Sequence, residues 1–151
     1  VMVQVNTSGE ASKSGLPPAT ESSDCIDLAL HIARNCPNLE FRGFMTIGGR
    51  GQERAAECFE LLARCRAALC GGGDAAGDTD PTLQFSEANV ELSMGMSADY
   101  ELAIAHGSTN VRIGSTIFGA RDESAMAAAR EKEAAADAEA DMNRASNGSS
   151  Q

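Results

Sequence analysis

The sequence predicts an α/β fold in which strands and helices alternate and the strands form one parallel sheet. Two observations support this prediction. Four short apolar segments are each followed by a polar turn, as is typical of buried strands. Helical segments lie between them, and the longer ones repeat their apolar residues at helical spacing. Such alternation favours right-handed crossovers and a parallel sheet.

Residues 1–5 form the first predicted strand, because valines at alternate positions would share one face. Asn6 stands at its carboxyl end and a polar loop follows. The first predicted helix begins after Ser22 or Ser23 and ends before Pro37. Its apolar positions share one helical face: Cys25, Leu28, Ala29, Ile32 and Cys36.

A second strand is predicted at residues 41–47 and a second helix at residues 52–70. The apolar stripe of this helix consists of Ala55, Phe59, Leu62 and Leu69. Glu60 and Arg64 are spaced to pair on its outer face. Residues 71–81, rich in Gly and Asp, have the composition of a flexible insertion without a functional role.

Two neighbouring strand ends within residues 92–119 predict one anion site. The first strand covers residues 90–93, and a helix is expected from residue 98 to about 106 with Ser97 as its N-cap. The first amides of a helix lack intrahelical acceptors and lie at the positive end of its dipole. An oxyanion is therefore expected beside Met96 and Ser97.

The second strand end repeats this arrangement. Residues 110–113 predict a strand, and Gly114 and Ser115 open a tight turn after it. Turns after the last two strands of a β/α barrel often bind phosphate, so the pair fits that arrangement if these strands close a barrel. Arg112 would point inward between two outward apolar neighbours. Its buried guanidinium needs an acceptor, which could be a carboxylate, a phosphate or a ring nitrogen of a ligand.

Composition limits the partners. The formal net charge is −10 with only 12 Lys plus Arg, which argues against nucleic acid and anionic membrane as partners. Five cysteines without a C-x-x-C pair predict neither a metal site nor a disulfide framework. Without a membrane-length apolar run or a signal-peptide pattern, a cytoplasmic location is the simplest expectation. A strand pattern beginning at Val1 suggests that the native N-terminus lies elsewhere, so a mitochondrial location stays open, as does the oligomeric state.

Residues 92–121, LSMGMSADYELAIAHGSTNVRIGSTIFGAR, resemble the closing segment of the pyridoxal phosphate homeostasis protein family, whose fold is similar to the barrel domain of alanine racemase. VQVNTSGEASKSG at 3–15 and FRGFMTIG at 41–48 resemble two earlier segments of that family in the same order. A complete barrel has eight strands and about 250 residues, so the resemblance implies the C-terminal half of a TIM (β/α)8 barrel over residues 1–121. Residues 122–151 are expected to form an Ala/Glu-rich helical or disordered tail.

The resemblance implies a non-catalytic carrier or buffer of pyridoxal 5′-phosphate (PLP) in intracellular PLP homeostasis. It places the phosphate at Met96, Ser97, Gly114 and Ser115, and it places Arg112 opposite the pyridine nitrogen. A guanidinium does not readily give up its proton, so the ring nitrogen stays unprotonated and the ring is a poor electron sink. Low reactivity suits a carrier.

Two alternatives remain. A racemase or decarboxylase on the same barrel would generally need a second acid–base group, and the only tyrosine, Tyr100, lies on the helix predicted after Ser97. The chain could also be a truncated half-barrel that binds little, because the resemblance places the Schiff-base lysine in a first barrel strand that this chain lacks. Lys13 and Lys132 are the only lysines, and neither matches that position. Lys13 is interpreted as a solvated loop residue on the ligand-facing rim.

Overall fold

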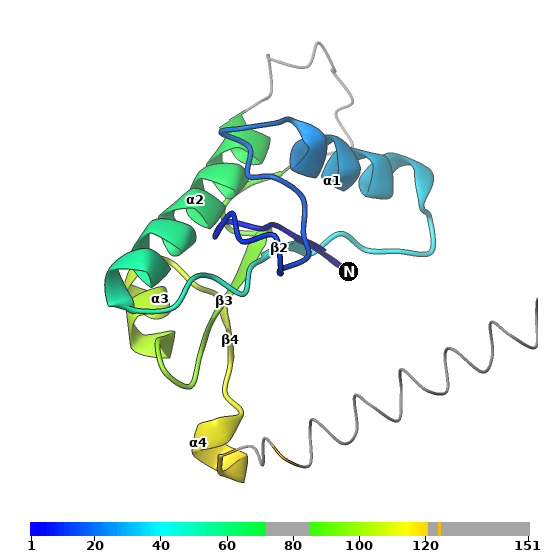
Figure 1. Cartoon of the computed structure of the whole chain (residues 1–151). Coiled ribbons are helices and arrows are strands. Elements are labelled where there is room, and N and C mark those ends of the chain that lie inside the picture. The colour runs from blue at the N-terminus through cyan, green and yellow to red at the C-terminus, as the bar shows by residue number, and fades with distance from the viewer. Residues whose placement is uncertain (72–84, 121–123, 125–151) are drawn as a thin grey trace, which may run out of the picture. The chain divides into compact units, whose positions relative to one another are not determined.

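The computed structural model describes residues 1–71, 85–120 and 124, and strands alternate with helices along them (Figure 1). The chain divides into two compact units, Val1–Gly114 and Ser115–Gln151. The strands described in the first unit are β1 (Met2–Gln4), β2 (Gly43–Met45), β3 (Glu91–Met96) and β4 (Asn110–Arg112). Its helices are α1 (Asp24–Asn35), α2 (Gln52–Gly71) and α3 (Tyr100–Ala105). The second unit begins with α4 (Ser115–Phe118).

The strands form one parallel sheet in the order β1-β2-β3-β4. In the central register, Phe44 pairs with Val3 on one side and with Leu92 on the other. Each strand is followed by a helix before the next strand joins the sheet in sequence order. Sequential parallel strands with intervening helices form a sector of a β/α barrel. The predicted α/β class is therefore confirmed.

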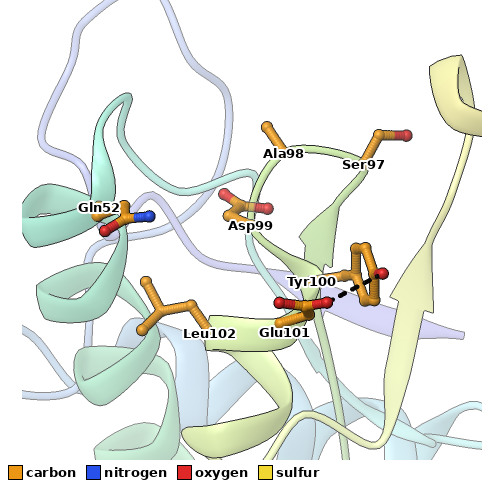
Figure 2. Close-up of a pocket in the computed structure, with 7 residues that line it drawn as sticks. All are labelled: Gln52, Ser97, Ala98, Asp99, Tyr100, Glu101 and Leu102. Atoms are coloured by element: carbon orange, nitrogen blue, oxygen red, sulfur yellow. Dashed lines mark hydrogen bonds between the residues drawn. The ribbon is translucent and has the colours of Figure 1, made fainter.

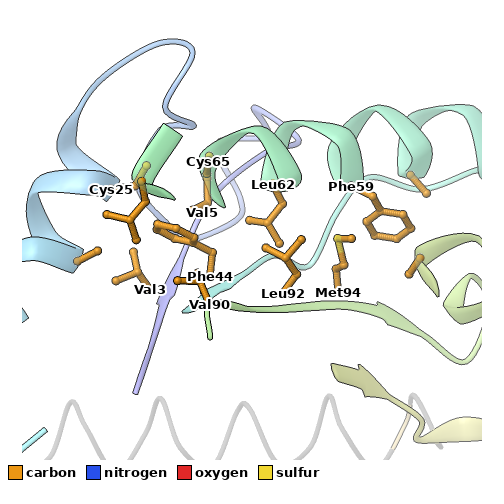
Figure 3. Close-up of a cluster of buried hydrophobic side chains, with 14 residues drawn as sticks. Val3, Val5, Cys25, Phe44, Phe59, Leu62, Cys65, Val90, Leu92 and Met94 are labelled. Atoms are coloured by element: carbon orange, nitrogen blue, oxygen red, sulfur yellow. The ribbon is translucent and has the colours of Figure 1, made fainter. Parts of the chain in front are cut away.

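The hydrophobic core lies between the sheet and the helices that cover one of its faces (Figure 3). Fully or almost fully buried side chains from the strands are Val3, Phe44, Leu92 and Met94. They face buried side chains of α2, among them Phe59, Leu62 and Cys65. The apolar stripe predicted for α2 is buried throughout. On the outer face Arg64 donates to Glu60 at 2.7 Å, which confirms the predicted pair.

Helix α1 begins after Ser23 and ends at Asn35, as the sequence predicts. Its packed face is shifted from the predicted one, because Ile26 and Leu30 pack against the core beside the buried Cys25 and Ala29, whereas Leu28 is 40% exposed. The helix packs on the edge strand β1 and on α2.

Two predicted segments lie outside the described residues. These are most of the insertion expected at 71–81 and, apart from Ser124, the tail expected at 122–151. Within the described ranges, none of the helices combines the length and the apolar character that a membrane span requires.

Candidate functional site

The carboxyl end of β3 differs from the prediction. The strand continues through Gly95 to Met96, and α3 starts only at Tyr100, with Asp99 rather than Ser97 at the N-cap position. Gly95 has φ 91°, and a Cβ at this position would collide with the Ala103 side chain, so only glycine lets the strand end pass this close to α3. The expectation that Ser97 caps a helix from residue 98 is wrong for this reason.

The Met96 amide is already engaged. Its N–H donates to Asp99 Oδ1 at 2.6 Å, and the Asp99 amide donates back to the Met96 carbonyl at 3.0 Å. The Met96 side chain is 38% exposed. The amide that was expected to receive an oxyanion therefore holds a carboxylate of the same turn.

The two predicted turns come together. The Gly114 amide donates to Ser97 Oγ at 3.1 Å, so the residue after β3 contacts the residues after β4 directly. The carboxyl ends of neighbouring parallel strands lie at one edge of the sheet, which explains this convergence. Ser115 comes next in the chain and begins α4 of the second unit.

Arg112 lies across the sheet beside this edge. Its Nη1 donates to the carbonyl and to Oγ of Ser93, both at 2.9 Å, and its Nη2 donates to the Thr46 carbonyl at 2.7 Å. Burial lowers the pKa of the guanidinium, and the negative charge of Asp99 opposes this shift. The side chain thereby links β4 to β3 and to the residue that follows β2.

The acceptors of Arg112 were not found by sequence reasoning, which expected a carboxylate, a phosphate or a ligand nitrogen. Both protein partners had a weak signal, since each is a polar residue within a predicted strand, Ser93 at 90–93 and Thr46 at 41–47. The three bonds engage at most three of the five guanidinium N–H donors. A ligand could therefore still be bound by the remaining donors.

Lys13 lies on the same rim but is not a solvated loop residue, as the sequence interpretation had it. Its ammonium donates to Glu10 Oε1 at 2.7 Å and to the Gly48 carbonyl at 2.6 Å, and its side chain is 20% exposed. The hydrogen bond from Lys13 lowers the pKa of Glu10. Lys13 thus joins the loop after β1 to the loop after β2, which gives it a structural role.

A buried hydroxyl pair at this rim was also missed. Thr7 and Thr46 lie 2.9 Å apart through their Oγ1 atoms, and the Gly48 amide donates to Thr46 Oγ1 at 3.2 Å. Threonines at the carboxyl ends of two neighbouring predicted strands are the signal that could have found them. The pair thus gives the loop after β1 and the loop after β2 a second link beside the bond from Lys13 to Gly48.

A small cavity of about 270 Å³ lies between the start of α2 and α3 (Figure 2). Its lining includes Gln52, Ser97, Asp99 and Tyr100. The Tyr100 hydroxyl donates to Glu101 Oε1 at 3.3 Å within the same helix. Among the described residues, no three His, Cys, Asp or Glu side chains lie close enough together to hold a metal ion.

A parallel sheet covered by helices, with loops and polar side chains gathered at its carboxyl edge, defines a domain of the β/α-barrel type with a candidate ligand site at that edge. Residues 1–122 match the family model described as the alanine racemase N-terminal domain, and the chain belongs to that family.

Similar proteins include several named pyridoxal phosphate homeostasis protein. The human protein is 51% identical over 127 residues, which cover 82% of this chain and 41% of the human one. The Caenorhabditis elegans protein is 42% identical over 81% of this chain and 46% of its own length. The chain thus spans less than half the length of these curated relatives. The resemblance found in the sequence is confirmed.

Two solved structures are also similar. A crystal structure of an unknown protein from Bifidobacterium adolescentis has 38% identity and a TM-score of 0.60, covering 78% of this chain and 42% of that one. PipY of Synechococcus elongatus, determined without PLP, has 30% identity and a TM-score of 0.55. That match covers 78% of this chain and 48% of PipY.

Proposed function

We propose that the protein binds PLP as a non-catalytic carrier or buffer in intracellular PLP homeostasis, with the cytoplasm as its compartment. The choice of PLP as the ligand is supported by the names of the relatives, which are called pyridoxal phosphate homeostasis protein. The observation that carries the proposal is the bond from the Gly114 amide to Ser97 Oγ, which joins two strand-end turns. Arg112, held in place by Ser93 and Thr46, ends the strand that leads into the second turn. This edge offers a phosphorylated ligand the Ser97 hydroxyl and the guanidinium donors of Arg112 that the protein does not use.

In the proposed site, the phosphate lies against Ser97 and Gly114, with Met96 beside them in the first turn. The Ser97 hydroxyl donates to the phosphate, while Ser97 Oγ accepts the Gly114 amide. A donor of Arg112 that is not used by the protein faces the pyridine nitrogen. Because three backbone and side-chain bonds fix the guanidinium, its direction is set before the ligand arrives. The role of Ser115 remains a prediction from the sequence.

The absence of catalysis is part of the proposal, and two features support it. An unprotonated pyridine nitrogen opposite Arg112 would make the ring a poor electron sink. Tyr100, the only tyrosine of the chain, donates to Glu101 on its own helix.

The function is tested by titrating PLP into the purified chain and assaying racemase, transaminase and decarboxylase activity on a panel of amino acids. We expect saturable binding without turnover. A chimera completed with the part of the human relative that this chain does not cover is titrated in parallel, because the chain covers 41% of that protein. Sustained turnover by either protein would contradict the carrier proposal. If neither the chain nor the chimera bound PLP, the proposal that PLP is the ligand would be contradicted.

Ser97→Ala is expected to weaken PLP binding by roughly 10- to 100-fold, since a charge-assisted hydrogen bond contributes about 1.5–3 kcal/mol. Binding of pyridoxal, which lacks the phosphate, should change little. Affinities are measured by fluorescence or calorimetric titration. Ser14→Ala, an exposed serine in the loop after β1, is the matched control and should bind like wild type. An equal loss for pyridoxal and PLP would place the phosphate elsewhere.

A further inference from the structure

The turn between β3 and α3 is closed by the carboxylate of one of its own residues, Asp99. Asp99 Oδ1 accepts the Met96 amide at 2.6 Å, and the bond back from the Asp99 amide closes the turn. The Asp99 side chain lies at the inner side of the bend that carries Ala98, whereas the Ser97 side chain points away from it (Figure 2). A hydrogen bond from an amide to an ionised carboxylate is stronger than a neutral one. The carboxylate therefore stabilises this turn in the absence of any ligand.

The same turn presents Ser97 to the second turn. Ser97 Oγ accepts the Gly114 amide at 3.1 Å, and its position depends on the fold of residues 96–99. Both amides that were expected to hold a phosphate directly, those of Met96 and Gly114, thus have partners inside the protein. An anion that used the Met96 amide would first have to displace Asp99.

We propose that Asp99 is a positioning residue of the anion site: it holds the Met96 amide, keeps the turn folded around Ser97, and directs a phosphate group to Ser97 instead of the Met96 amide. The identity of the phosphorylated ligand rests on the proposed function. The role of Asp99 in the turn rests on the geometry alone.

The Asp99 charge has a second consequence at the site. It opposes the burial that lowers the pKa of Arg112, so the carboxylate lies within electrostatic range of the guanidinium. It also repels an incoming phosphate. As an acceptor, Asp99 Oδ1 keeps the turn folded and favours ligand binding, whereas the negative charge of Asp99 opposes it. Asparagine distinguishes the two effects, because it keeps an Oδ1 acceptor and lacks the charge.

The experiment compares Asp99→Ala and Asp99→Asn in the full chain. Without ligand, NMR follows hydrogen exchange and the chemical shift of the Met96 amide proton. We expect exchange to rise at least tenfold in Asp99→Ala, because the lost bond is to a charged group and such bonds contribute about 1.5–3 kcal/mol. In Asp99→Asn the resonance should move upfield while the amide remains protected. Glu101→Ala removes an equal charge from the exposed face of α3 and should change neither signal.

With ligand, the affinities for PLP and for inorganic phosphate are measured on the same proteins. Asp99→Ala should weaken both by about tenfold, and Asp99→Asn should stay within about threefold of wild type. Tighter binding by Asp99→Ala would show that the anion competes with Asp99 for the Met96 amide and would overturn the proposal. Unchanged exchange and unchanged affinity in Asp99→Ala would overturn it as well.

Two further outcomes are decisive. If Asp99→Ala does not fold, the upfield shift and retained affinity of Asp99→Asn support the proposal, and a loss above tenfold in Asp99→Asn contradicts it. If neither wild type nor the chimera binds PLP or phosphate, the proposed function fails. Exchange at the Met96 amide in Asp99→Ala still decides whether Asp99 holds the turn.

Discussion

Gly43→Ala is expected to destabilise the sheet more than any other single substitution considered in this chain. Gly43 has φ 146°, and a Cβ added there would collide with the backbone of Glu91. The two residues are paired in the register of β2 and β3, so neither backbone can move without breaking the ladder. Backbone strain of about 1–3 kcal/mol adds to overpacking of about 1–3 kcal/mol. The sum approaches the whole stability of a marginal domain, about 5–15 kcal/mol.

The measurement is urea unfolding followed by far-ultraviolet circular dichroism. Gly71→Ala at the end of α2 is the matched control, because a Cβ there meets no atom within 4 Å. Since alanine is the better helix former, the control should be neutral or slightly stabilised. A Gly43→Ala midpoint equal to that of wild type would mean that β2 and β3 are not paired in this register.

The helical spacing of apolar residues predicted the two long helices, because the residues that a helix buries against the core must lie on one of its faces. The α2 stripe is buried as expected. The same pattern misplaced part of the buried face of α1, where Leu28 has helical spacing but is 40% exposed. The length of β2 was also overestimated: residues 41–47 were predicted, whereas the strand is Gly43–Met45. Apolar alternation continues past the point where the paired backbone ends, so it does not define strand ends.

The site was predicted at the level of topology and not at the level of individual hydrogen bonds. Parallel strand ends must meet at one edge, so the contact between Ser97 and Gly114 followed from the strand assignment. Ser97 and Asp99 are both good N-cap residue types. The choice between them depends on how closely Gly95 approaches α3, which is a tertiary property. The bond from Arg112 to Thr46 joins residues 66 positions apart, and no local pattern encodes it.

Arg112→Ala is expected to reduce both the stability of the sheet and the affinity for PLP. The substitution removes three hydrogen bonds and leaves the Thr46 carbonyl and the Ser93 hydroxyl without their guanidinium partner. Hydrogen bonds to charged groups contribute about 1.5–3 kcal/mol each. Because Arg112 is only partly buried and water can replace some of these bonds, we expect a net loss of about 2–3 kcal/mol in the free energy of unfolding.

Arg112→Lys distinguishes the geometry of the guanidinium from its charge. One ammonium keeps the charge but lacks the planar fork that reaches Ser93 and Thr46 together, so an intermediate loss of about 1–2 kcal/mol is expected. Arg64→Ala removes an exposed arginine from the Glu60 pair on α2 and should cost less than about 1 kcal/mol. Unfolding curves and PLP titrations are recorded for all three variants. If Arg112→Lys matched wild type in both measurements, a single positive charge would suffice, and the links from Arg112 to the other two strands would not contribute to stability or to binding.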